Sequence, residues 1–182
     1  TKVAFEIAEG MEYLHSKRVI HRDLKTGNVL LDGDTPKITD FGYARTNLSL
    51  VMTSKVGTIN YMAPEVIEGG CYDFKADVFS YAMMLWELYS GTFPFSWVSR
   101  ARVADEILAD SQLPYKMPIS PDLKQLIEDG KSFDPNKRPT FTEIIERMIQ
   151  NNITYNGANP NEVENFYKMK AEKRANKKEG QE

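Results

Sequence analysis

Residues 19–31 read VIHRDLKTGNVLL, and a polar cluster in this stretch interrupts an apolar, strand-like pattern. The apolar pair Val19-Ile20 precedes the cluster, and the apolar run Val29-Leu30-Leu31 follows it at once. Between them the sequence places one histidine, one arginine, one aspartate, one lysine and one asparagine. A polar segment between two strand-like pieces indicates a loop that presents functional side chains from a rigid support.

The whole chain has the composition of a soluble globular protein. Its 182 residues leave room for one domain of ordinary size and a tail. No apolar run approaches the roughly 18 to 20 residues that span a bilayer, and the first residues do not follow a signal-peptide pattern. The net charge of −3 gives no electrostatic case for nucleic acid as a main partner. The single cysteine, Cys71, cannot form an internal disulfide, which fits a reducing compartment.

The sequence patterns on either side of residues 19–31 predict a mainly helical fold with small β-hairpins. Residues 1–17 carry apolar side chains at positions 3, 7, 11 and 14, which predicts an amphipathic helix. Residues 29–31 and 37–39 read as strands, and Asp32-Gly33-Asp34 between them reads as a hairpin turn. Residues 42–60 show no sustained period and predict a long loop, which in a compact domain is usually functional.

The second half of the chain predicts several more helices. The sequence DVFSYAMMLWELY at 77–89 is apolar on nearly every face, as expected of a helix in the middle of a domain. Further helices are predicted at 99–110, from the cap Ser120-Pro121 to about residue 128, and from the capping box Thr140–Glu143 onward.

Residues 151–182 read as a polar and basic C-terminal tail, with helix expected only near its end. Six cations lie between Lys168 and Lys178 among few acidic residues. We expect a solvated helical or frayed tail. Binding of residues 168–178 to an acidic membrane or to nucleic acid remains an alternative.

Three motifs occur in a fixed order: His21-Arg22-Asp23-Leu24-Lys25-x-x-Asn28, Asp40-Phe41-Gly42 and Ala63-Pro64-Glu65. Each is weak by itself, because a turn can carry Asp-Phe-Gly by chance and an isolated Asp23 is ordinarily a turn residue bonded to its own backbone. Together they resemble the protein kinase signature, namely the catalytic loop, the metal-binding triplet and the end of the activation segment.

The resemblance covers the C-terminal lobe of the protein kinase fold, from the helix before the catalytic loop to about residue 150. It implies a catalytic loop at 21–28, an activation segment at 40–65 and a buried central helix at about 77–90. The expected fold class is therefore a protein-kinase-like C-terminal lobe, mainly α with small β-hairpins and without the N-terminal lobe.

The resemblance assigns the chemistry of phosphoryl transfer, which depends on positioning and charge neutralisation, to five residues. Asp23 would accept or orient the proton of a substrate hydroxyl, and Lys25 would steady the transferred phosphate. Asn28 and Asp40 would hold Mg²⁺ (or Mn²⁺) ions that bridge the phosphates of ATP, since oxygen ligands suit such hard cations. Leu30 would form the floor beneath adenine, although its pattern alone indicates only the buried face of a strand.

Other matched residues indicate the acceptor specificity. Lys25, two positions after Asp23, is typical of serine/threonine kinases, and Thr58 resembles the threonine that bonds the catalytic aspartate and lysine in those enzymes. The sequences YMAPE at 61–65 and DVFSYAMMLWELYSG at 77–91 are similar to those of the tyrosine-kinase-like group, which includes Raf-like and mixed-lineage kinases. Dual specificity, for Tyr as well as for Ser and Thr, remains an alternative.

The resemblance also implies structural roles. His21 is expected to be a packed core residue, with Phe41 of the Asp40-Phe41-Gly42 triplet stacked near it. Glu65 would form a buried ion pair with Arg138, and Asp77 would accept hydrogen bonds from the backbone of the catalytic loop. By contrast, His15 is expected from the sequence alone to lie at the C-terminal end of a helix, where the helix dipole favours it.

Regulation by phosphorylation is expected because Arg22 directly precedes Asp23. A phosphate in the long loop would pair with a cationic pocket that contains Arg22 and order the loop. The candidate sites are Thr46, Ser49, Thr53 and Ser54, of which Ser54 is favoured.

The chain departs from the family pattern at two places. Gly130-Lys131 stands where the tyrosine-kinase-like group usually has Cys-Trp, and the missing indole is expected to weaken the packing there. Gly130 is also expected to end its helix as a left-handed cap. Ala82 stands where glycine is common in the buried helix.

In kinases three features precede the catalytic loop: a Gly-rich loop over the phosphates, a lysine on a strand that pairs with the phosphates, and a glutamate that pairs with this lysine. These 182 residues contain none of the three. We therefore expect half of an active site, with the N-terminal lobe as a missing partner and with little activity in the isolated chain.

The leading hypothesis is a serine/threonine protein kinase that binds ATP and a protein with a Ser or Thr acceptor. The alternative is a non-catalytic kinase-like interaction module. The intact Asp23, Asn28 and Asp40 argue against loss of activity by mutation. The expected location is intracellular, in the cytoplasm or at the cytoplasmic face of a membrane for a receptor kinase, with membrane contact only through parts outside this chain.

Overall fold

The computed structural model describes residues 1–43, 58–70, 73–155 and 157–179. The helices are α1 (Lys2–Ser16), α2 (Pro64–Ile67), α3 (Phe74–Ser90), α4 (Val103–Leu108), α5 (Pro121–Gly130), α6 (Phe141–Gln150) and α7 (Pro160–Glu179). The strands are β1 (Val29–Asp32) and β2 (Thr35–Ile38), and short 3₁₀ helices lie at Thr26–Asn28, Phe41–Tyr43, Ile59–Tyr61, Arg100–Arg102 and Pro135–Lys137.

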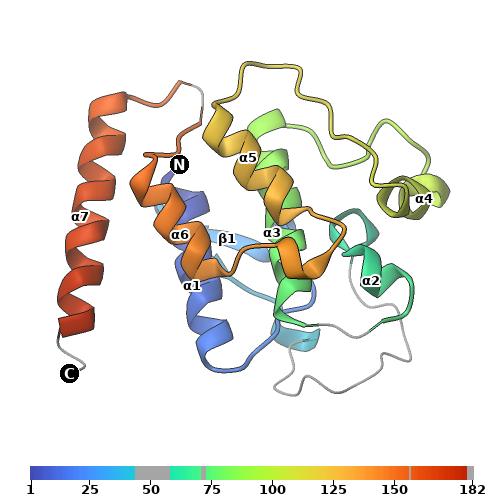
Figure 1. Ribbon diagram of the computed structural model, residues 1–182, viewed down its shortest axis with the longest axis horizontal. Coiled ribbons are helices and arrows are strands. Elements are labelled where there is room, and N and C mark those ends of the chain that lie inside the picture. Colours follow the sequence, from blue (N-terminus) through green and yellow to red (C-terminus); the bar gives the residue numbers. More distant parts are fainter. Residues whose placement is uncertain (44–57, 71–72, 156, 180–182) are drawn as a thin grey trace.

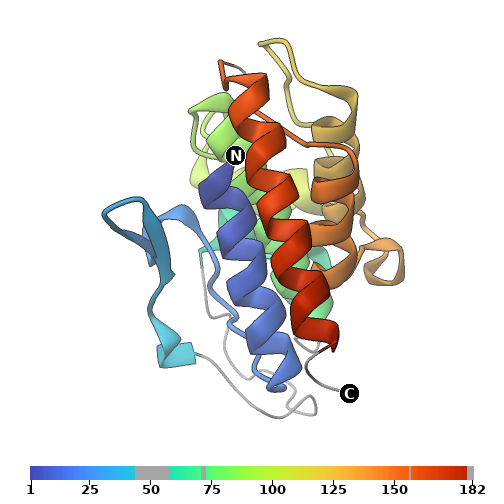
Figure 2. The same ribbon diagram turned by 90° about the vertical axis from the view of Figure 1, so that its left-hand side faces the viewer.

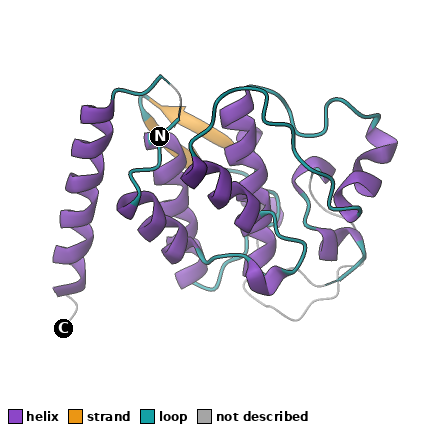
Figure 3. Cartoon of the chain, turned by 45° about the horizontal axis from the view of Figure 1, so that its top comes forward, coloured by secondary structure: helices purple, strands orange, loops and turns teal. Residues whose placement is uncertain are grey.

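Helix α3 runs through the middle of the molecule, with α2 and α4 on one side and α7 at the opposite edge (Figure 1). Helices α1 and α6 pack on each other, and α5 packs on α3. Helices dominate the described chain, and the strands form a single hairpin (Figure 3). The predicted fold class, mainly helical with a small hairpin, is confirmed at the level of the described residues.

Helix α3 is the buried central helix that its apolar sequence predicts. It begins earlier than the sequence suggests because Asp73 caps it, accepting hydrogen bonds from the backbone of Lys75 and Ala76. Gly91 ends it in the left-handed conformation, with φ at 63°. Residues 76–86 are buried on all faces, so the rest of the domain packs around this helix.

The predicted caps of α5 and α6 are present. The Ser120 hydroxyl accepts from the Leu123 amide, and Pro121 stands in the first turn of α5. At α6 the Glu143 amide donates to the Thr140 hydroxyl, and the Thr140 amide donates to the Glu143 carboxylate. This closed capping box places Phe141 on the buried face of α6.

Strands β1 and β2 form the predicted hairpin, with Val29 opposite Ile38 and Asp32 opposite Thr35. Gly33 takes the left-handed conformation that the two-residue turn requires, with φ at 58°. Leu30 is 59% exposed, so the interpretation of Leu30 as a buried strand residue is wrong. Its side of the hairpin is not covered by a second layer within the described part of the chain.

Two sequence expectations about the later helices are also wrong. Gly130 is the last residue of α5 and does not form a left-handed cap, because the helix ends at Lys131 with φ at −87°. Residues 160–179 are not a solvated tail: α7 lies beside α1 and runs parallel to it (Figure 2), and Val163 and Tyr167 are buried.

The residue at the position of the missing indole, Lys131, is buried. Lys131 is only 6% exposed, and its ammonium lies 3.1 Å from an Asp110 oxygen and 3.4 Å from a Glu128 oxygen. Its stem and Asp110 line a cavity of about 10 Å³ together with Phe79 and Ile107. Lys131 therefore leaves only a small cavity here, and long cationic side chains can cover apolar surface with their stems.

Candidate active site

The predicted catalytic loop, residues 21–28, is held in place by a buried carboxylate on α3. Asp77 is fully buried and accepts hydrogen bonds of 2.9 Å from the backbone amides of His21 and Arg22. Arg22 has a left-handed backbone conformation, with φ at 72°. Such a conformation persists only where surrounding contacts enforce it. The expected bonds from Asp77 to the loop backbone are thus present in the structure.

His15 at the end of α1 joins the same carboxylate. Its Nε2 lies 2.9 Å from Asp77 Oδ2, and its ring packs between Phe74 and Phe141. The expectation that His15 acts only in the helix dipole missed this contact, because the 62 residues that separate the two side chains in sequence carry no local signal.

Asp23 lies at the centre of a network of donors. Its Oδ1 accepts from the Thr58 amide at 3.0 Å, and its Oδ2 accepts from the Asn28 amide group at 3.0 Å. The Lys25 ammonium lies 2.9 Å from Oδ2 and donates to the Thr58 hydroxyl at 2.8 Å. The aspartate is only 6% exposed, so these charge-assisted bonds hold its carboxylate in one orientation.

Thr58 lies 35 residues after Asp23 in the sequence. The structure therefore brings together four residues that the sequence assigned to the site, namely Asp23, Lys25, Asn28 and Thr58.

Asp40 lies just beyond β2 on an exposed turn, with φ at 63°. Thr39 before it donates to the Asn28 carbonyl from its amide at 2.8 Å and from its hydroxyl at 3.1 Å. This backbone tie holds the segment that bears Asp40 beside Asn28. No contact between the side chains of Asp40 and Asn28 is present among the residues described, and the sequence pattern did not identify Thr39.

The expected stack of Phe41 near His21 is present. The ring centroids are 5.3 Å apart in an edge-to-face arrangement, and His21 is fully buried while Phe41 remains 48% exposed. His21 Nε2 lies 3.0 Å from the Thr39 carbonyl oxygen, which occupies one ring nitrogen. A Cβ on Gly42 would lie 3.3 Å from an Asp40 oxygen, so a larger residue there would crowd the carboxylate.

The donor set fits magnesium in chemical type. Both hydrogen bonds of the Asn28 side chain within the described chain use its amide nitrogen, so its amide oxygen is left for a cation. That oxygen and the exposed Asp40 carboxylate are the hard oxygen ligands that Mg²⁺ prefers, with water completing the shell. Across the described ranges, no group of three or more His, Cys, Asp or Glu side chains is arranged to hold a metal ion.

A further network, which the sequence did not reveal, links the catalytic loop to the end of the activation segment. The Glu87 carboxylate on α3 accepts from the Thr26 hydroxyl at 2.8 Å and from the Tyr61 hydroxyl. Burial, together with the hydrogen bond to Glu87, raises the pKa of Tyr61 well above its usual range, so the phenol stays protonated. Glu87 was overlooked because it stands within an almost wholly apolar helix.

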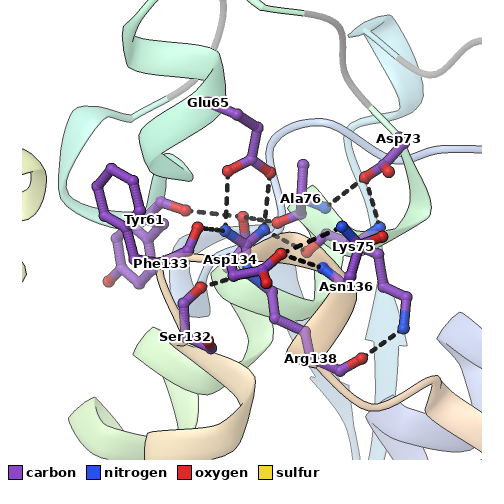
Figure 4. Close-up of polar contacts among 11 residues, drawn as sticks. Tyr61, Glu65, Asp73, Lys75, Ala76, Ser132, Phe133, Asp134, Asn136 and Arg138 are labelled. Atoms are coloured by element: carbon purple, nitrogen blue, oxygen red, sulfur yellow. Dashed lines mark hydrogen bonds and ion pairs between the residues drawn. The ribbon is translucent and has the colours of Figure 1, made fainter.

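The expected ion pair of Glu65 and Arg138 is present and bidentate, at 2.7 and 2.8 Å (Figure 4). Arg138 is 1% exposed, and its guanidinium also donates to backbone carbonyls of Lys75, Ser132 and Phe133. The pair therefore joins the end of the activation segment to the segment before α6, with the buried cation fully bonded.

The predicted phosphorylation sites fall on a part of the chain that the structure does not describe. Thr46, Ser49, Thr53 and Ser54 lie outside the described residues. Arg22, the proposed phosphate partner, is 5% exposed.

An apolar pocket of about 290 Å³ opens directly beside Thr58. Its lining comes from the 3₁₀ helix Ile59–Tyr61, the loop after α3 and the start of α4. Phe93, Phe95 and Val98 are among its apolar lining residues, and Arg100 also lines it.

In the described residues, no helix is long and apolar enough to cross a membrane.

Comparison with known proteins agrees with the geometry. The family model described as "protein kinase domain" matches residues 1–148. The serine/threonine-protein kinase STY17 of Arabidopsis thaliana is 46% identical over 153 residues, which are 82% of this chain and 27% of that protein. STY46 of the same plant is 43% identical over 150 residues, and mitogen-activated protein kinase kinase kinase 11 of Rattus norvegicus is 38% identical over 158 residues.

The chain spans about a quarter or less of the length of these relatives: 27% of STY17, 26% of STY46 and 19% of the rat kinase. The match covers the catalytic loop, the Asp40-Phe41-Gly42 triplet and the Glu65–Arg138 pair in one stretch. The chain belongs to the protein kinase family, and its relatives place it in the tyrosine-kinase-like group.

Proposed function

We propose that these residues form the C-terminal lobe of a serine/threonine protein kinase that transfers the γ-phosphoryl group of ATP to protein Ser or Thr hydroxyls. The observation that carries the proposal is the Asp23 carboxylate, on which Lys25, Asn28 and the Thr58 amide converge. A carboxylate held in this way can orient a hydroxyl for in-line attack.

In the proposed reaction the substrate hydroxyl oxygen forms a bond to the γ-phosphorus, the bond from that phosphorus to the bridging oxygen breaks, and ADP leaves. The proton of the hydroxyl passes to Asp23. Lys25, 2.9 Å from that carboxylate, neutralises charge on the transferred group. Leu30, exposed on β1, offers apolar surface to the adenine ring.

Asn28 and Asp40 would hold Mg²⁺ or Mn²⁺ through the Asn28 amide oxygen and the Asp40 carboxylate. The bound cation supplies charge neutralisation to the phosphate oxygens. The two hydrogen bonds from Thr39 to the Asn28 carbonyl keep the two ligand-bearing segments adjacent.

Preference for Ser and Thr over Tyr is supported by the bond from Lys25 to the Thr58 hydroxyl. This bond draws the segment at Thr58 close to Asp23, which favours a short acceptor side chain. The adjacent apolar pocket would receive a neighbouring residue of the substrate.

We infer that the 182 residues by themselves transfer phosphate poorly, since they contain no Gly-rich loop or strand lysine to hold the phosphates from the other side. A kinase of this kind acts where ATP and protein substrates occur together, so we place it inside the cell.

The test is a labelled-ATP assay of the full-length gene product with Ser, Thr and Tyr peptide substrates. We expect transfer to Ser and Thr, and a fall of about 10²- to 10⁴-fold in kcat for Asp23→Asn. Asp34→Asn, an exposed change in the hairpin turn, is the matched control and should leave kcat unchanged.

Transfer that persists in Asp23→Asn would contradict the role of Asp23. If the wild-type gene product transfers no phosphate, the non-catalytic interaction module becomes the better assignment. Preferred transfer to Tyr would contradict the proposed specificity alone.

A further inference from the structure

The family match ends at residue 148, yet the chain continues into α7, which packs along α1. The aromatic part of the contact centres on Phe5, which is fully buried. Its ring meets Phe166 and Tyr167 edge-to-face, with centroids 5.4 and 5.5 Å apart. Tyr167 is 1% exposed, and its hydroxyl donates to the Ile153 carbonyl at 2.6 Å, which joins α7 to the segment that follows α6.

Further along the same two helices the contact becomes ionic. The Lys170 ammonium lies 2.5 Å from Glu9 and 3.3 Å from Glu6, and it also stands over the ring of Phe5. One turn later, the two terminal nitrogens of Arg174 bond both carboxylate oxygens of Glu12, at 2.7 and 2.8 Å. The hydrogen bond to Glu12 raises the pKa of Arg174, as expected of a fork-to-fork pair.

The two faces are complementary in spacing and in charge. On α7 the contact residues lie at 163, 166, 167, 170 and 174, the period of one helix face. On α1 the acidic residues lie at 6, 9 and 12, three positions apart on one side. We call the surface of Phe5, Glu6, Glu9 and Glu12 the acidic face of α1.

We propose that the acidic face of α1 is a recognition surface for a basic helix that carries a pair of aromatic residues and that α7 is its ligand within the chain. The recognised pattern is an aromatic pair followed by a cation three residues after the second aromatic and another cation four residues later. The aromatic contacts supply burial, and the two cations favour one register, because a shift by one turn would leave only one of Lys170 and Arg174 opposite a carboxylate of this face.

The acidic face also has a link to the catalytic loop. His15 in the last turn of α1 contacts Asp77, and Asp77 in turn holds the backbone of His21 and Arg22. Docking of α7 therefore buttresses the helix that leads into the candidate active site. It also occupies Lys170 and Arg174, which leaves fewer cations for the membrane or nucleic-acid contact that the basic tail suggested.

The test is hydrogen–deuterium exchange with mass spectrometry on the 182-residue chain. Arg174→Glu places two carboxylates against each other, and we expect exchange of the α7 amides to rise about tenfold, which corresponds to about 1.4 kcal/mol of docking free energy. Glu12→Arg should do the same. The double variant that carries both Glu12→Arg and Arg174→Glu should restore the protection of the α7 amides to within about threefold of the wild type.

Lys173→Glu is the matched control, because it makes the same charge change on an exposed position of α7. It should change exchange by less than about twofold. Exchange of the α3 amides serves as the internal reference, since it rises only if the whole domain unfolds.

A synthetic peptide with the sequence of residues 158–179, added in excess, should compete with α7 and raise its exchange in the wild-type chain. The proposal fails if Arg174→Glu raises the exchange of the α7 amides no more than Lys173→Glu does, or if the double variant does not restore their protection. It also fails if the excess peptide leaves α7 exchange unchanged. None of these outcomes depends on kinase activity.

Discussion

At the scale of the residue, the two departures from the family pattern meet in space. A Cβ built on Gly130 would lie 2.8 Å from the Cβ of Ala82, closer than two such atoms can approach. The alanine on α3 is therefore accommodated by the glycine on α5. Two features that look like separate weaknesses in the sequence form one packed contact between α3 and α5.

This contact predicts a coupled pair of substitutions. Gly130→Ala should destabilise the chain by about 1 to 3 kcal/mol, because the added methyl group overpacks the contact. Ala82→Gly combined with Gly130→Ala should recover most of that loss, since the methyl group then has space. Urea unfolding of the two single variants and the double variant gives the coupling energy. Additive losses would show that the two helices do not meet here.

The Glu65–Arg138 pair gives a second prediction at this scale. Glu65→Gln removes the charge partner of an arginine that is 1% exposed, and unfolding free energy should fall by about 3 kcal/mol. Glu106→Gln breaks the exposed pair of Glu106 with Arg102, which is 67% exposed, and should cost less than about 0.5 kcal/mol. Equal losses in urea unfolding would contradict the distinction between the buried and the exposed pair.

At the scale of the element, the capping box of α6 predicts a pH dependence. Hydrogen bonds from the amide and hydroxyl of Thr140 lower the pKa of Glu143 below its ordinary 4.5. A lowered folded-state pKa means that the ionised carboxylate stabilises the fold above the ordinary pKa and that this contribution is lost as the pH falls through the lowered value.

The measurement compares the wild type with Glu143→Gln, which keeps an acceptor but does not titrate. The stability difference in favour of the wild type should shrink between about pH 6 and about pH 3. The change should be small because the carboxylate is largely exposed. A difference that stays constant across this range would show that the ionised carboxylate does not contribute to the cap.

At the scale of the whole molecule, Asp77 joins three segments that are far apart in sequence: the end of α1, the catalytic loop and α3. Asp77→Ala should leave the secondary structure intact and loosen the loop, raising exchange of the amides of His21 and Arg22 about tenfold. Asp105→Ala, at an exposed position on α4, is the control. Unchanged exchange at residues 21 and 22 would contradict the role of Asp77 as the support of the loop.

Much of this molecule could be predicted from the sequence because the signals are local. The period of residues 1–17, the caps at Ser120 and Thr140 and the glycine at the hairpin turn depend on neighbours within a few positions, and the structure has each of them. The ordered motifs likewise identified the protein kinase family. The roles of Asp23, Asn28 and Asp40 in catalysis stay predictions.

The contacts that the sequence did not reveal all join distant segments. Glu87 with Thr26 and Tyr61, and His15 with Asp77, leave no periodic trace, since their partners lie far away along the chain. The face of α7 was missed for a related reason. It changes from aromatic to cationic along its length, and only the matching change on α1 makes it a contact surface.

The sequence by itself determined the family, the helical class, the caps and the identity of the charged residues, because these follow from local pattern and ordered motifs. Only the tertiary structure decided that Glu87 joins Thr26 to Tyr61, how Ala82 and Gly130 fit each other and where the last helix docks. These depend on distances between side chains, and such distances exist only after the chain has folded and brought remote residues into contact.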